Sequence, residues 1–183
     1  MSESQFWQVA GEVMVPLVVL AAWIDWRRHR VPNWLSLIIA ALGLSVQTYF
    51  YGGTGLLTSG AGWAAGLGLL IVPWAMHLMG AGDVKLLAGI GAWLGPKLVL
   101  WAFVTGAMIG GLMGVVMILI AGRIKPALEN ASFLTFKLSS RETAFSDLGS
   151  VKQMGSHAQL LPYGVPLTLG TLVVTALKIG GWW

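Results

Sequence analysis

The chain contains 183 residues, of which 56% are hydrophobic and only 10% are charged. Soluble domains carry roughly 25% charged residues, so the composition excludes an ordinary water-soluble domain and predicts an integral membrane protein. A bilayer-spanning helix needs about 20 mostly apolar residues, so the chain has room for several spans but for no sizeable soluble domain as well. Cysteine is absent, which excludes disulfides, thiol nucleophiles and cysteine-based zinc sites.

The apolar runs predict an all-α fold with about six membrane-spanning helices. Their expected bounds are Phe6–Ile24, Asn33–Phe50, Leu57–Met79, Val84–Leu94, Lys97–Ala121 and Gln159–Gly180. The residues before the first helix include no Lys or Arg, so this helix is expected to remain in the mature protein and not to be a cleaved signal. The fourth helix is too short to cross a hydrocarbon core about 30 Å thick. It must begin inside the membrane boundary or extend back through residues 80–83.

The net charge is +4, and most basic residues gather in two connections between apolar runs. These residues are Arg27, Arg28 and Arg30 in the first connection, and Arg123, Lys125, Lys137, Arg141 and Lys152 in the polar segment 122–157. Because Lys and Arg favour cytoplasmic loops, both connections are predicted to be cytoplasmic and both termini external. The charge is therefore interpreted as a topology signal, and no nucleic-acid partner is expected. Residues 1–183 are predicted to form a single integral membrane domain, with 122–157 as a cytoplasmic loop within it.

Glycines recur at intervals of four, as in Gly62–Gly66 and Gly106–Gly110–Gly114. Small residues at this spacing allow helix backbones to approach closely in lipid, where packing drives association. The spacing predicts a compact, glycine-rich bundle. A dedicated dimer face is the alternative interpretation, and the sequence does not predict an oligomeric state.

Two acidic residues, Asp25 and Asp83, stand at corresponding places where an apolar segment meets the predicted cytoplasmic boundary. Taken singly, Asp25 has a structural role as an ion-pair partner of Arg27 or Arg28, and Asp83 as the cap of a helix that begins at Val84. Taken together, they suggest a catalytic pair. Two adjacent carboxylates share a proton, so one activates water as a base while the other polarises a carbonyl as an acid. This is the chemistry of an aspartyl protease, and it requires the first and fourth helices to pack together.

Three segments resemble motifs of a known family. Gly80-Ala81-Gly82-Asp83 matches the GxGD signature of intramembrane-type aspartyl proteases, and Val84-Lys85 after it makes the segment similar to type IV prepilin peptidases. Asp25, followed by basic residues and Val31-Pro32-Asn33, resembles that family's first catalytic motif. Leu161-Pro162-Tyr163-Gly164-Val165-Pro166 resembles a segment near its C-terminal span.

The resemblance implies a membrane-embedded aspartyl endopeptidase of the bacterial inner membrane, with Asp25 and Asp83 as the catalytic pair and without a metal or cofactor. Its implied substrate is the apolar helix of a prepilin or pseudopilin, whose leader it removes at the cytoplasmic face. Larger members carry paired CxxC motifs and a methyltransferase activity. Since this sequence has no cysteine, it resembles the short, peptidase-only form of tight-adherence (Flp) pilus systems.

Other residues around the pair have expected supporting roles. Gly80 and Gly82 leave room for a substrate backbone and permit unusual dihedral angles before Asp83. Pro32 and Asn33 fit the first turn and the cap of the second helix. Lys85 is expected either to balance the charge of the pair or to extend to the lipid headgroups.

Two functions of other classes remain open, namely a small proton-coupled transporter or channel and a non-catalytic assembly component of a pilus or secretion system. His77 lies close in sequence to the GxGD segment, but a single histidine without an orienting partner is weak evidence for catalysis. Glu12, within the first predicted helix, has no assigned role.

Overall fold

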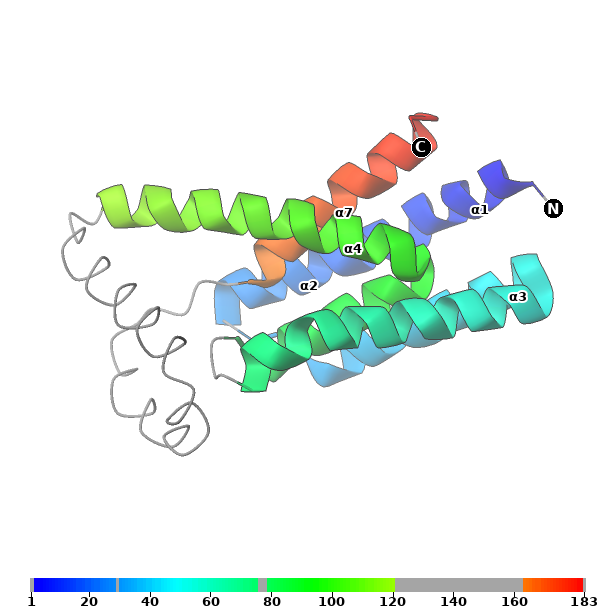
Figure 1. The fold of residues 1–183 in the computed structure, drawn as a ribbon, viewed down its shortest axis with the longest axis horizontal. Coiled ribbons are helices and arrows are strands. Elements are labelled where there is room, and N and C mark those ends of the chain that lie inside the picture. Colours follow the sequence, from blue (N-terminus) through cyan, green and yellow to red (C-terminus); the bar gives the residue numbers. More distant parts are fainter. Residues whose placement is uncertain (1, 29, 76–78, 121–162, 183) are drawn as a thin grey trace, which may run out of the picture. The chain divides into compact units, whose positions relative to one another are not determined.

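The computed structural model describes residues 2–28, 30–75, 79–120 and 163–182. Helices connected by short turns make up these residues, and none of the described ranges contains a β-strand, so the predicted all-α class is confirmed (Figure 1). Internal contacts distinguish two compact units, residues 1–110 with 161–183, and residues 111–160. In the second unit the described part is 111–120, the end of helix α4.

The first helical stretch consists of α1 (Glu3–Val9), the π-helical segment η1 (Ala10–Met14) and α2 (Val15–Arg28). Ser2 begins it with a capping box, in which its hydroxyl accepts from the Gln5 N–H and the Gln5 side chain accepts from the Ser2 N–H. The π-helical turn immediately precedes Pro16, which has no N–H to donate to the preceding turn. The helix continues beyond the predicted end at Ile24, so that Asp25 lies inside its last turn.

Helix α3 (Asn33–Ala75) is interrupted at Gly52, where φ is 61° and ψ is −138°. A side chain would be strained at this positive φ, and glycine allows the chain to reverse direction there. Figure 1 shows the two limbs of α3 doubling back on each other. The limbs correspond to the predicted helices Asn33–Phe50 and Leu57–Met79, although the expected connection of several residues is reduced to the turn at Gly52 and the second limb ends at Ala75.

Helix α4 (Ala81–Ile120) is interrupted in the same way at Gly95, where φ is 75° and ψ is 174°, and Pro96 follows. Its first limb corresponds to the short predicted helix Val84–Leu94 and begins three residues earlier, at Ala81. The helix therefore extends back through residues 81–83, the second of the two expected solutions to its short length, whereas a start inside the membrane boundary stays a prediction. The second limb matches the predicted helix that begins at Lys97.

Polar side chains satisfy the carbonyl groups that the break in α4 leaves open. Because Pro96 has no N–H, the Ala92 carbonyl lacks its usual helical donor, and it accepts instead from the Ser59 hydroxyl at 2.8 Å. The Trp93 carbonyl accepts from Gln47 Nε2, also at 2.8 Å. In an apolar environment such groups must find partners within the protein. These two bonds explain why Ser59 and Gln47 are buried in otherwise apolar helices.

The first limb of α4 lies in the core of the first unit. Leu86, Leu87, Ile90 and Trp93 are all fully buried. Close packing around this limb depends on glycine, because a Cβ added at Gly62 would overlap the carbonyl of Gly91. Glycines also bring the second limb of α4 against the last helix, where Gly170 approaches Gly106. These contacts confirm the close packing predicted from the glycine spacing.

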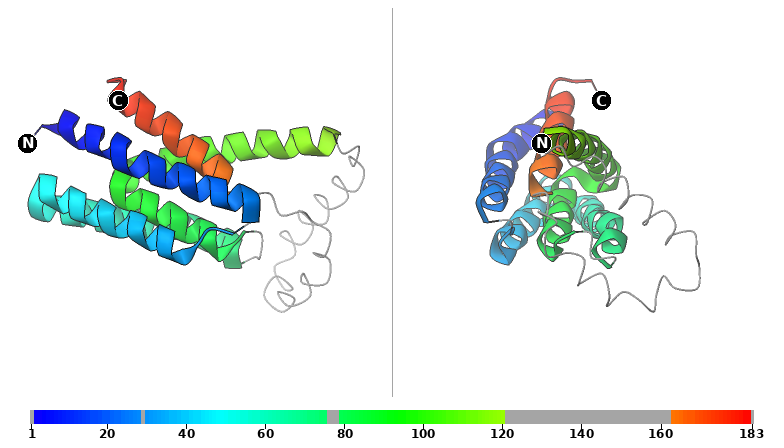
Figure 2. Two further views of the ribbon diagram at one scale, coloured as in Figure 1. Left: turned by 180° about the vertical axis from the view of Figure 1, so that it is seen from behind. Right: turned by 90° about the vertical axis from the view of Figure 1, so that its left-hand side faces the viewer.

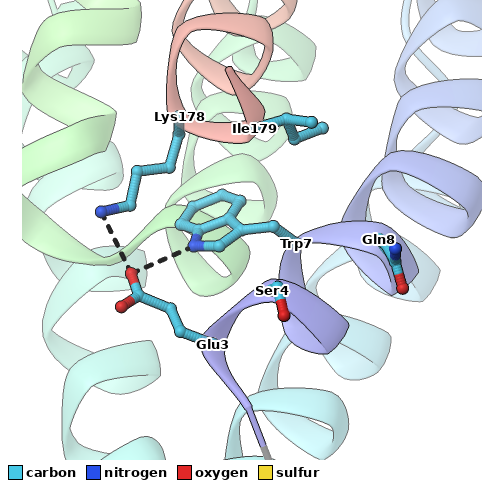
Figure 3. Close-up of a pocket in the computed structure, with 6 residues that line it drawn as sticks. All are labelled: Glu3, Ser4, Trp7, Gln8, Lys178 and Ile179. Atoms are coloured by element: carbon cyan, nitrogen blue, oxygen red, sulfur yellow. Dashed lines mark hydrogen bonds and ion pairs between the residues drawn. The ribbon is translucent and has the colours of Figure 1, made fainter. Parts of the chain in front are cut away.

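Helix α7 (Gly164–Ile179) packs antiparallel to α1 and α2 (Figure 2). A Cβ added at Gly170 of α7 would lie 2.5 Å from the Gly106 backbone nitrogen in α4. At one end of the pair, Lys178 forms an ion pair with Glu3 at 3.0 Å. Trp7 donates its indole N–H to the same carboxylate at 3.4 Å, beside an open cavity of about 330 Å³ (Figure 3). These contacts place the start of α1 and the end of α7 at the same end of the unit.

Among the described residues, three helical stretches are long and apolar enough to cross a membrane, namely Glu3–Arg28, Asn33–Ala75 and Ala81–Met117. Helix α7 is apolar but shorter. The predicted membrane protein is confirmed at this level. The count of six spans and the external termini stay predictions, as does the single domain.

Candidate active site

Asp25 projects from the last turn of α2 into the interior, where only 3% of its surface is exposed. Its Oδ2 accepts a hydrogen bond of 2.9 Å from the backbone N–H of Gly164, the first residue of α7. The N-terminal N–H groups of a helix have no partner within the helix and are suited to binding a carboxylate. Helix α7 thus supplies a donor that orients Asp25.

Asp83 is the third residue of α4 and is also buried, with 7% of its surface exposed. Its backbone N–H donates to the Gly80 carbonyl at 3.2 Å. Since α4 begins at Ala81, Asp83 lies within the first turn, and the alternative in which it caps a helix starting at Val84 is wrong. Val31, six residues after Asp25, contacts Gly82, the neighbour of Asp83, so the end of α2 and the start of α4 are brought together although they are separate helices.

The GxGD segment packs directly against the first motif. A Cβ added at Gly82 would lie 3.1 Å from the carbonyl oxygen of Val31, and 3.2 Å from its Cβ. A Cβ at Gly80 would meet Asp83 Oδ2 at 3.4 Å, an ordinary contact distance. Neither glycine is among the residues with positive φ in the described ranges, so the expected unusual dihedrals are not found there. Gly82 instead permits the close approach of the two motifs.

A second contact between the two motif segments is the hydrogen bond between Lys85 and Asn33. Lys85 Nζ donates to Asn33 Oδ1 at 3.0 Å. The side chain of Asn33 therefore contacts the GxGD segment and does not cap its own helix as expected. Pro32 precedes that helix, and its carbonyl accepts from the N–H groups of Leu35 and Ser36 at 3.1 and 3.3 Å. Pro32 thus stands at the start of α3, as its fixed φ predicts.

Gly164 is a site residue for which the sequence predicts no role, although its segment resembles a family motif. A glycine between two prolines at the start of a helix is the local signal that could have pointed to this position. Its hydrogen-bond partner, Asp25, lies 139 positions away in the sequence, so the contact itself could not be predicted. A Cβ at Gly164 would come within 2.7 Å of Asp25 Oδ2, so this position requires glycine for close approach.

Comparison with known proteins places these residues in a family. The sequence profile of the type IV leader peptidase family matches residues 13–115. This segment covers more than half of the chain and includes both aspartates. The chain belongs to the type IV leader peptidase family.

A curated relative is the prepilin leader peptidase/N-methyltransferase of Xanthomonas campestris pv. campestris. It is 30% identical over 127 residues, which is 64% of this chain and 43% of the relative. The chain therefore spans less than half of that relative's length. No solved structure matches the chain.

The remaining residues considered in the sequence lie outside the candidate site or outside the described ranges. His77 and residues 122–157 lie outside the described ranges. Glu12 lies in η1 with its side chain exposed. Within the described ranges no three His, Cys, Asp or Glu side chains gather as a metal site would require.

Proposed function

We propose that this leader peptidase family member is an aspartyl endopeptidase with Asp25 and Asp83 as its catalytic pair. The observation that carries the proposal is that two buried carboxylates, at the end of α2 and at the start of α4, flank the contact between Val31 and Gly82. The family's activity supports a peptidase, and the Asp25–Gly164 hydrogen bond supports a defined orientation for one acid.

The proposed reaction needs only these two side chains and water. One carboxylate accepts a proton from water, whose oxygen attacks the scissile carbonyl carbon, while the protonated carboxyl of the other donates to the carbonyl oxygen. Collapse of the tetrahedral intermediate breaks the C–N bond, and the departing nitrogen takes up a proton from the pair. Gly80 is exposed beside Asp83, so the missing side chain leaves a path for a substrate backbone at this point.

The proposed substrate is a prepilin or pseudopilin whose leader is cut at the cytoplasmic face of the bacterial inner membrane. The name of the Xanthomonas relative supports a prepilin leader as substrate. The described residues provide six helical segments for a multi-pass topology, namely the first helical stretch, the two limbs of α3, the two limbs of α4, and α7. The Arg residues that follow Asp25 support a cytoplasmic position for the site. Because the sequence contains no cysteine, we propose peptidase activity without N-methylation.

The deciding experiment is cleavage of a co-expressed prepilin by the wild type, Asp25→Asn and Asp83→Asn at matched membrane levels. Asparagine keeps the size of each side chain and removes its charge. Both variants are expected to abolish the size shift of the substrate. Glu12→Gln is the matched control, because Glu12 is an exposed acid on the same helical stretch as Asp25. Cleavage that survives either aspartate change would favour a transporter or a docking component instead.

A further inference from the structure

A groove with a polar end and an apolar remainder lies beside the candidate site. Its volume is about 310 Å³, and both limbs of α3 and the start of α4 line it. Asn33, Ser36 and Lys85 form the polar end, whereas Leu37, Ala40 and Trp63 line the remainder. The polar residues belong to the first turns of their helices, so this end lies level with Asp83.

The groove and the catalytic pair are separated by the first turn of α4. Asp83 and Lys85 are two positions apart, and such residues point to different faces of a helix. Asp83 is buried, whereas Lys85 is exposed and donates to Asn33. A molecule in the groove would therefore lie against the outer side of the GxGD helix and not between the two aspartates.

One charged group at this end is suited to an external ligand. The ammonium of Lys85 donates to the neutral Asn33, and among the described residues no carboxylate forms an ion pair with it. Ser36 lines the groove, but its hydroxyl oxygen is buried, with no hydrogen-bond partner among the described residues. A ligand in the groove would therefore meet the exposed ammonium of Lys85 at this end.

The shape and polarity of the groove distinguish between ligand classes. One turn of a helix with its side chains is about 10 Å across and about 5.4 Å long, so it occupies more space than the groove volume of about 310 Å³. The backbone N–H and C=O groups of an extended peptide would meet no polar partner along Leu37, Ala40 and Trp63. An acyl chain has no such groups, and an anionic headgroup complements the uncompensated Lys85.

We propose that this groove is a binding site for an anionic phospholipid, with its phosphate at Lys85 and one acyl chain along Leu37, Ala40 and Trp63. Leu37 is 70% exposed and Trp63 is 45% exposed, so the groove opens on the surface that faces lipid in a membrane protein. The bound lipid would pack against α4 next to Asp83 and couple the composition of the membrane to the candidate site.

The test measures phosphatidylglycerol retained by the purified protein, by native mass spectrometry after extraction from phosphatidylcholine bilayers that contain a minority of phosphatidylglycerol. Lys85→Met is expected to lower retention by about fivefold, the effect of one cation near an anionic surface. Ala40→Phe is expected to lower it by filling the acyl path. Lys85→Arg keeps the charge and is expected to retain the lipid. Free glycerol phosphate, which lacks an acyl chain, is expected not to displace it.

Lys97→Met is the matched control, because Lys97 is an exposed lysine of α4 beyond the break at Gly95. Equal retention by the wild type, Lys85→Met and Ala40→Phe would overturn the proposal. An equal loss in Lys97→Met would reduce the effect to unspecific surface charge. If Ala40→Phe keeps its lipid but blocks processing of a prepilin, the groove belongs to the substrate. The lipid measurement needs no proteolysis, so it succeeds or fails independently of the proposed peptidase activity.

Discussion

Substitution of Gly164 tests whether α7 orients Asp25, one of the two proposed catalytic carboxylates. Gly164→Ala keeps the backbone N–H but adds a Cβ that would lie 2.7 Å from Asp25 Oδ2 and 3.1 Å from its Cγ. Carbon atoms in contact are ordinarily about 3.5–4.0 Å apart, so the carboxyl or the start of α7 must move by several tenths of an ångström. The hydrogen bond of 2.9 Å between Gly164 and Asp25 would then be lengthened or broken.

The size of the effect follows from the energy of that bond. A hydrogen bond to a charged group contributes about 1.5–3 kcal/mol, and about 1.36 kcal/mol in the activation barrier is a tenfold change in rate. Gly164→Ala is therefore expected to slow prepilin cleavage by about 10- to 100-fold. Alanine favours helix formation more than glycine does, so loss of the helix is not the expected cause.

The assay is the initial rate of cleavage of a purified prepilin by enzyme reconstituted in vesicles, with the melting temperature of each variant measured in parallel. Gly68→Ala is the matched control, because a Cβ at this helical glycine meets no atom within 4 Å. Gly68→Ala should cleave at the wild-type rate. A Gly164→Ala enzyme that also cleaves at the wild-type rate would refute the orienting role of α7.

Three further substitutions test the packing around the site. Gly82→Ala should slow cleavage more than Gly80→Ala in the same assay, because its Cβ would press on the Val31 backbone at 3.1 Å whereas that of Gly80 makes only a 3.4 Å contact; the reverse order would contradict this. Ser59→Ala should lower the free energy of unfolding by about 1–3 kcal/mol by leaving the Ala92 carbonyl unpaired. The control Ser45→Ala, which removes only a bond within its own helix, should change it little. Trp93→Ala should lower the free energy of unfolding, measured by denaturant titration, by about 3–5 kcal/mol because Trp93 is fully buried. An equal loss in the control Trp74→Ala, at a residue that is 46% exposed, would show that burial is not the cause.

The positions of the helices followed from the sequence because each apolar run is a local signal. The short helix before Gly95 was expected either to begin inside the membrane boundary or to extend back through residues 80–83, and it begins at Ala81. The turns at Gly52 and Gly95 were less predictable. Both depend on a single glycine with positive φ, and many other glycines in the same helices keep helical dihedrals because they serve close packing.

The sequence by itself determined that this is a helical membrane protein, with Asp25 and Asp83 at apolar boundaries and a GxGD segment before the second of them. Such features are set by composition and by spacing within a few turns. Only the tertiary structure decided that Gly164 donates to Asp25, that Asn33 binds Lys85, and that Ser59 and Gln47 satisfy carbonyls at the break in α4. Each of these bonds joins residues far apart in the chain. It exists because glycine contacts bring whole helices together in one register, which no local pattern encodes.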